Sequence, residues 1–226
     1  MTAPAVEVGD SWTFDRTIER GTEHLSHRRI TLRIERIDET AMLVRAQPGR
    51  APEAYEDYRV GLDWSQARVL DGVLTETGRP FKFPMVPGDS WTVDFSQAEQ
   101  HEGQTNTHWN VTYEVVGWTV VTTPAGTFRA LEIKEAGSIE AERAAPQVRA
   151  TTLLATTKRK IKSSGKNDVR HQSIHNMVYG EFYYVPSIKY YVKSFEEQYN
   201  ADNVRTGWDE DALVAFRPGV LATPHR

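Results

Sequence analysis

The chain has 226 residues, of which 39% are hydrophobic and 26% charged, a composition typical of a folded, soluble protein rather than a fibrous or disordered one. It has no cysteine, which excludes a disulfide scaffold, a thiolate zinc site and a cysteine nucleophile. The formal net charge of −4 argues against nucleic acid as a partner, and no apolar run is long enough to predict a transmembrane segment.

Alternation of apolar and polar residues dominates the chain from its first strand onward. It is clear in residues 12–19, 30–35 and 109–115, and we expect a further strand over 169–183. Turn-forming residues separate these runs at 21–22, 47–49, 71–72, 124–126 and 163–167. The pattern predicts a mainly β protein of about a dozen strands joined by antiparallel hairpins. Short helices are expected only at 97–101 and 139–145.

A five-residue sequence, Gly-Asp-Ser-Trp-Thr, occurs at 9–13 and again at 88–92. We expect each copy to form a tight turn, in which Asp accepts a hydrogen bond from a backbone N–H two residues further on, followed by a strand anchored by Trp. The repeat suggests two related halves, 5–80 and 84–218, inside one β-rich unit that covers 1–226.

Three stretches resemble a broad family of uncharacterised bacterial β proteins that are exported or lipoproteins. They are the two Gly-Asp-Ser-Trp-Thr sequences, the Pro-Ala-Gly-Thr-Phe turn within 121–133, and Tyr-Tyr-Val-Pro at 183–186 followed by Tyr-Val-Lys at 191–193. The resemblance implies a curved antiparallel sheet or open half-barrel, similar to that of the LolA-like lipoprotein carriers, and a periplasmic or other extracytoplasmic location. It carries over no catalytic residue. The chain differs from the family pattern in having Tyr-Tyr where Trp-Tyr is commoner and a longer insert after Gly137. The first six residues lack the pattern of a secretory signal, so a cytoplasmic location stays open.

Histidines are the first candidates for a metal site. His171 and His175 have the spacing of a helical zinc motif, but on a strand they lie roughly 13 Å apart, too far to share one ion. His101 and His108 would face each other across a hairpin, although two ligands are too few. We therefore expect no metal and no cofactor.

Aromatic residues are concentrated between 179 and 195. On a strand, Tyr179 and Tyr183 share one face, which is also that of His171 and His175. We assign these four residues as candidate contacts for a hydrophobic small molecule, with packing in the core as the alternative.

Charged clusters offer a second kind of site. Lys158, Arg159, Lys160 and Lys162 would gather at the tip of a hairpin, where they could meet anionic headgroups or an acidic partner, or else discourage aggregation of an exposed strand. The adjacent acids Glu196 and Glu197 should point to opposite faces of a strand, and we interpret them as a solvated edge or loop.

These patterns favour a non-enzymatic binding or envelope-associated protein, with an apolar or lipid-like molecule as ligand. One alternative is a hydrolase-type enzyme that uses His171, Glu181 and Tyr183 on one strand face. Another is an interaction protein that uses a sheet edge or the basic hairpin. The sequence predicts no catalytic residue and no oligomeric state.

Overall fold

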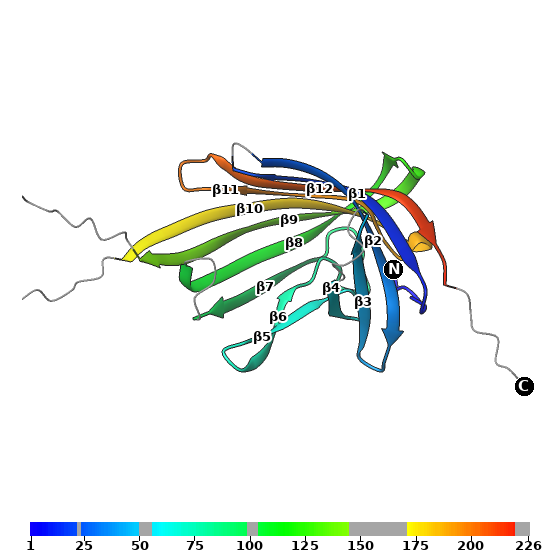
Figure 1. Cartoon of the computed structure of the whole chain (residues 1–226), viewed down its shortest axis with the longest axis horizontal. Helices are drawn as coiled ribbons and strands as arrows, with labels where there is room; N and C mark the ends of the chain where they lie inside the picture. Colours follow the sequence, from blue (N-terminus) through cyan, green and yellow to red (C-terminus); the bar gives the residue numbers. More distant parts are fainter. Residues whose placement is uncertain (22–23, 50–55, 99–103, 145–170, 220–226) are drawn as a thin grey trace, which may run out of the picture.

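The strands form one antiparallel sheet of twelve in the computed structural model, which describes residues 1–21, 24–49, 56–98, 104–144 and 171–219 (Figure 1). Their order across the sheet is β6-β5-β4-β3-β2-β1-β12-β11-β10-β9-β8-β7. The strands are β1 (Ser11–Arg20), β2 (His24–Ile37), β3 (Ala41–Pro48), β4 (Glu56–Gly61), β5 (Gln66–Leu70), β6 (Val73–Gly78), β7 (Ser90–Gln97), β8 (Gln104–Thr123), β9 (Gly126–Ala144), β10 (His171–Val185), β11 (Tyr190–Tyr199) and β12 (Arg205–Arg217). The predicted curved, antiparallel, mainly β fold is confirmed. No helix in these ranges has the length and apolar character needed to cross a membrane.

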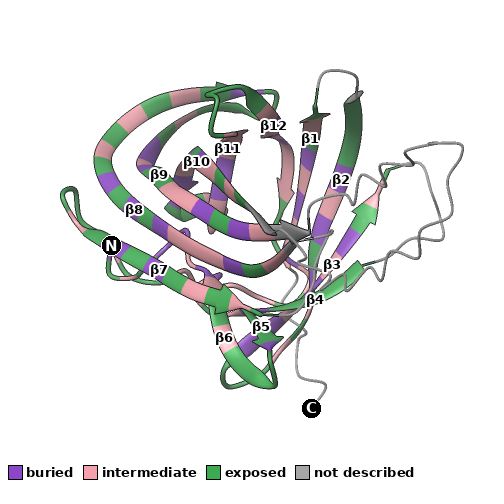
Figure 2. Cartoon of the chain, turned by 90° about the vertical axis from the view of Figure 1, so that its left-hand side faces the viewer, coloured by how far each residue is buried: buried purple, intermediate pink, exposed green. Residues whose placement is uncertain are grey.

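The sheet curls on itself, so that its two outermost strands approach each other. Figure 2 shows the strands following one another round a ring, from β8 through β10, β12 and β2 to β5 and β6. Strands β6 and β7 are the two ends of this order, and no ladder of backbone hydrogen bonds joins them. We call the boundary between them the seam. Trp91 bridges it by donating its Nε1–H to the carbonyl of Arg79 at 2.7 Å, and the amide of Ala98 donates to the Asp71 carboxylate at 3.1 Å.

Alternate side chains of each strand enter the interior of the curled sheet. In β1, Trp12 and Phe14 are fully buried while their neighbours are partly exposed, as the alternation predicts. The segment that joins β6 to β7 adds Phe81, whose ring contacts those of Tyr184 and Tyr190. The short 3₁₀ helix η1 (Pro186–Ile188) follows β10, and its last carbonyl accepts the Trp12 Nε1–H at 2.7 Å. An aromatic core thus fills part of the interior and leaves the remainder to the cavity described below.

The two Gly-Asp-Ser-Trp-Thr sequences adopt the same turn. Gly9 and Gly88 have φ angles of 91° and 93°, a conformation that favours glycine. The Asp10 carboxylate accepts the amide of Glu7 at 2.8 Å, and the Asp89 carboxylate accepts that of Val86 at 2.9 Å. The aspartates therefore bind an amide three residues earlier, whereas the sequence predicted an amide two residues later. The difference arises because the turn precedes the aspartate.

The helix expected at 139–145 is wrong, because residues 139–144 belong to β9 and pair with β10. Ile139 and Ala141 are buried and Glu140 is exposed, which is a strand period. Of the other expected helix, residue 97 ends β7, residue 98 follows that strand without helical structure, and 99–101 lie outside the described residues.

Candidate functional site

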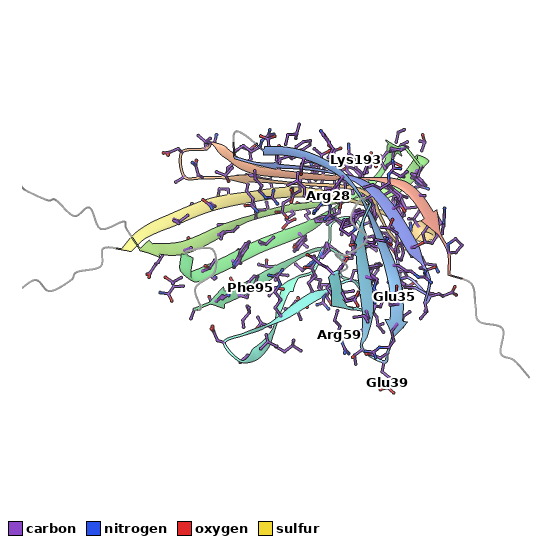
Figure 3. The ribbon with its side chains drawn as sticks, in the orientation of Figure 1. Arg28, Glu35, Glu39, Arg59, Phe95 and Lys193 are labelled. Carbon is purple, nitrogen blue, oxygen red and sulfur yellow. The ribbon has the colours of Figure 1, made fainter. Side chains whose placement is uncertain are left out.

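An interior cavity of about 830 Å³ lies inside the curled sheet. Strands from both ends of the sheet order contribute to its wall, with Thr77 at the end of β6 and Val93 on β7, so the cavity adjoins the seam. Figure 3 shows Phe95 on β7, the strand that borders this seam. The apolar side chains that line the cavity are Leu32, Val60, Val93, Phe95, Trp109, Val111, Val178 and Phe182.

A row of directly paired residues crosses the cavity wall through four neighbouring strands. Tyr113 of β8 pairs with Glu135 of β9, Glu135 pairs with Gly180 of β10, and Gly180 pairs with Glu196 of β11. Directly paired residues of antiparallel strands place their side chains on the same face. Tyr113, Glu135 and Glu196 all line the cavity, so this face is the inner one. We call these four residues the acidic row.

Glycine at position 180 makes room for the Glu135 carboxyl. A Cβ atom at this position would lie 2.9 Å from Glu135 Oε2 and 3.0 Å from the backbone oxygen of Phe195. Any larger residue would therefore displace the acid or the neighbouring strand. Because Gly180 has no side chain, the Glu135 carboxyl occupies the inner face directly above it.

Glu135 is only 7% exposed, and its Oε2 has no hydrogen-bond partner among the described residues. Burial raises the pKa of its carboxyl to about 8, and the charge of Glu196 adds to this rise, while a hydrogen bond with Tyr113 opposes it. Glu135 therefore carries a proton at neutral pH. A buried polar atom without a partner is costly, which makes this oxygen a candidate contact for a ligand.

Burial raises the pKa of Glu196 as well. A hydrogen bond from Gln198 Nε2, at 3.1 Å, opposes the rise, whereas the charge of Asp209 adds to it. Arg20 is the cation near Glu196, but its guanidinium binds Asp209 through two hydrogen bonds of 2.7 and 2.8 Å. The carboxyl groups in and next to the acidic row therefore outnumber the cations that act on them.

A matched ion pair lies beside the acidic row. Arg16 of β1 donates two hydrogen bonds of 2.7 and 2.6 Å to the buried Asp211 of β12, and the Tyr191 hydroxyl donates to the same carboxylate at 2.8 Å. The positive charge of Arg16 is thus neutralised within the protein. The other charged residues of the cavity wall are Glu56, Asp57, Arg59 and Arg68, of which Asp57 pairs with Arg45 and Arg59 with Asp38.

The candidate contacts predicted from the sequence lie elsewhere. Tyr179 is 42% exposed and contacts the ring of Tyr199, and His175 is near Glu140 at 3.5 Å. The hydroxyl of Tyr183 donates to Glu181. These residues alternate with Val178 and Phe182, which line the cavity, so they occupy the outer face of β10. They do not approach the acidic row.

The side chains of the remaining predicted residues lie outside the part of the chain that the structure describes. His171 begins β10, but its side chain is outside the described part of the structure, as are Lys158, Arg159, Lys160 and Lys162. Within the described ranges, no three His, Asp or Glu side chains are grouped so that they could hold a metal ion.

Sequence reasoning missed the acidic row. Glu196 and Glu197 do point to opposite faces, but β11 lies between β10 and β12 rather than at an edge, so the inward Glu196 is not solvated as predicted. The signal for Glu135 was its position in β9, where alternate residues from Leu131 through Ile133 to Ile139 are buried. An acidic residue at a strand position where apolar residues would be buried is the pattern that could have indicated a binding role for Glu135.

Comparisons with known proteins give the following results. No family model matches the chain, and no curated protein matches it. One similar solved structure is a protein of Bacteroides fragilis with a YmcC-like fold, provisionally described as exported. It is 18% identical to this chain, with a TM-score of 0.42, and the match covers 96% of this chain and 98% of that protein. A Parabacteroides distasonis protein provisionally described as a lipoprotein is 15% identical, with a TM-score of 0.42. The match covers 95% of this chain and 97% of that protein. The hypothetical lipoprotein YmcC of Escherichia coli is 11% identical, with a TM-score of 0.30. The match covers 93% of this chain and 86% of that protein.

Proposed function

We propose that the chain is a non-enzymatic binding protein that holds one apolar or amphipathic small molecule in its interior cavity. The observation that supports this function is the cavity itself, at about 830 Å³, whose wall combines apolar and aromatic side chains with charged and polar ones. Pockets for small molecules have volumes of about 300 to 1,000 Å³. An extracytoplasmic location is part of the proposal and rests on the sequence resemblance.

The hydrolase-type alternative has less support. Glu181 and Tyr183 are in contact, but they lie on the outer face of β10 beside Lys134 and do not line the cavity. An interaction through a sheet edge also has less support, because β6 and β7 face each other across the seam.

Filling the cavity tests the proposal. Val93 is buried in the cavity wall on β7, so the indole of a Val93→Trp variant would occupy the space that a ligand needs. We expect this variant to bind the neutral fluorescent probe N-phenylnaphthylamine at least about tenfold more weakly than the unaltered chain. Fluorescence titration measures both affinities.

Val120→Trp is the matched control, because Val120 is 70% exposed and lies outside the cavity. It should leave the affinity for the probe unchanged. Circular dichroism shows whether both variants retain the fold. A folded Val93→Trp variant that binds the probe as tightly as the unaltered chain would overturn the proposal.

A further inference from the structure

We propose that the cavity selects amphiphiles with a primary ammonium group, which binds between Glu135 and Glu196 while the apolar body extends along β7 and β8. This inference rests on the proposed function and specifies the chemistry of its ligand. Four observations support it: the two acids on one face, the unpartnered oxygen, the aromatic rings around them and the direction of the apolar wall.

Two acids flank Gly180 from the neighbouring strands. Glu135 and Glu196 are each paired with Gly180, so their backbones lie about 10 Å apart, twice the spacing between strands. Their side chains project into the same cavity, and the charge of Glu196 already acts on Glu135. A single small cation between these side chains can therefore interact with both carboxylates.

The unpartnered oxygen indicates a hydrogen-bond donor as the missing group. Glu135 is more than nine-tenths buried, lines the cavity, and leaves its Oε2 without a partner among the described residues. Arg20, the cation that acts on Glu196, and Arg16 in the cavity wall are each held by an aspartate through two hydrogen bonds. A primary ammonium group has three N–H donors, and so can donate to this oxygen and to Glu196 together.

The charge state of Glu135 is consistent with this ligand. With a pKa of about 8, the acid carries a proton at neutral pH in this structure. An ammonium group that enters the site replaces that proton, which leaves to solvent, and binds to the resulting carboxylate. The bond between the ammonium and carboxylate is then charge-assisted and stronger than one to an alcohol.

Aromatic rings surround the acidic row on the inner face. Phe182 lies between Tyr113 and Tyr191, with ring centroids 6.4 and 6.1 Å away. The faces of such rings attract organic cations and add to the affinity for an ammonium group.

The apolar wall continues from the acidic row in one direction. The next inward pair on β7 and β8 is Val93 with Val111, and the following one is Phe95 with Trp109, whose rings stack at 5.7 Å. From Tyr113 to Trp109 the wall extends about 14 Å along β8. A dodecyl chain fits along these two pairs with its polar end at Glu135.

The test compares three probes with the same chain and different polar ends: dodecylamine, dodecanol and dodecanoate. Each is titrated below its micelle concentration into the folded protein by isothermal calorimetry at neutral pH. We expect dodecylamine to bind at least about tenfold more tightly than dodecanol, and dodecanoate to bind most weakly.

Two variants connect that preference to the acidic row. Glu135→Gln and Glu196→Gln should each weaken dodecylamine binding about tenfold and leave dodecanol binding within about twofold of the unaltered chain. Retained binding of dodecanol shows that the cavity is intact. Glu140→Gln is the control, since Glu140 is an exposed acid on the outer face of the same strand.

The outcomes separate the inference from the proposed function. Equal affinities for the amine and the alcohol, or Gln variants that bind the amine normally, would overturn the ammonium site and leave the cavity as a binding site. Absence of binding for all three probes would overturn both.

Discussion

At the scale of single residues, the unusual feature is an acid within the interior of a sheet. Glu135 occupies an inward position of β9 that would be apolar in an ordinary strand, and its neighbours Ile133 and Ile139 on that face are buried. Burial holds the pKa of Glu135 at about 8, well above that of a free glutamate. A charged Glu135 therefore costs the folded state free energy that a neutral side chain would not.

The pH dependence of stability should reveal this cost. A carboxyl whose folded pKa of about 8 exceeds its unfolded value of 4.5 binds more protons in the folded state, so the free energy of unfolding falls as pH rises between these values. The slope is at most about 1.4 kcal/mol per pH unit, and the contribution is constant above pH 8. Urea denaturation between pH 6 and 8.5 should show the unaltered chain losing stability relative to Glu135→Gln.

Glu140→Gln again serves as the control and should follow the unaltered chain. A Glu135→Gln variant whose stability changes with pH in parallel with the unaltered chain would show that Glu135 titrates near its ordinary value. The raised pKa of Glu135 could then no longer support a ligand site at the acidic row.

At the scale of elements, the two Gly-Asp-Ser-Trp-Thr turns share a backbone but differ in what surrounds the aspartate. Asp10 is fully buried and, besides the turn amide, accepts hydrogen bonds from the Gly219 amide at 2.7 Å and the Lys189 ammonium at 2.9 Å. Asp89 is partly exposed and accepts the turn amide of Val86. The first turn thus connects the start of β1 with η1 and with the segment after β12.

Alanine substitution at the two aspartates should separate these roles. Asp10→Ala removes the carboxylate that accepts from the Glu7 and Gly219 amides and from the Lys189 ammonium, so we expect it to lower the free energy of unfolding by about 3 kcal/mol. Asp89→Ala removes one hydrogen bond and should cost about 1 kcal/mol. Chemical denaturation of both variants measures the difference, and equal costs would show that Lys189 and Gly219 add nothing.

The elements were more predictable than the site. Alternation and turn residues depend on neighbours in sequence, so they indicated the strands around Trp12 and Trp109 and the turn at 71–72, where Asp71 and Gly72 have φ angles of 50° and 81°. The segment 139–145 was misassigned because charged residues there hid the alternation of Ile139 and Ala141. The acidic row depends on which strands become neighbours, and the pairing of Glu135 with Gly180 and of Gly180 with Glu196 has no local signal.

At the scale of the whole molecule, curvature brings the ends of one sheet together and encloses a volume. The seam has no backbone ladder and is bridged at Trp91 and Asp71 by the two hydrogen bonds described above. Residues of β6 and β7 line the cavity, so the seam forms part of its wall.

Native mass spectrometry of the folded chain mixed with dodecylamine tests whether the interior of the curled sheet binds one amphiphile. We predict one bound molecule per chain, retained in Val120→Trp and lost in Val93→Trp, whose new side chain fills the cavity. A spectrum without bound dodecylamine, or equal occupancy in Val93→Trp and the unaltered chain, would contradict it.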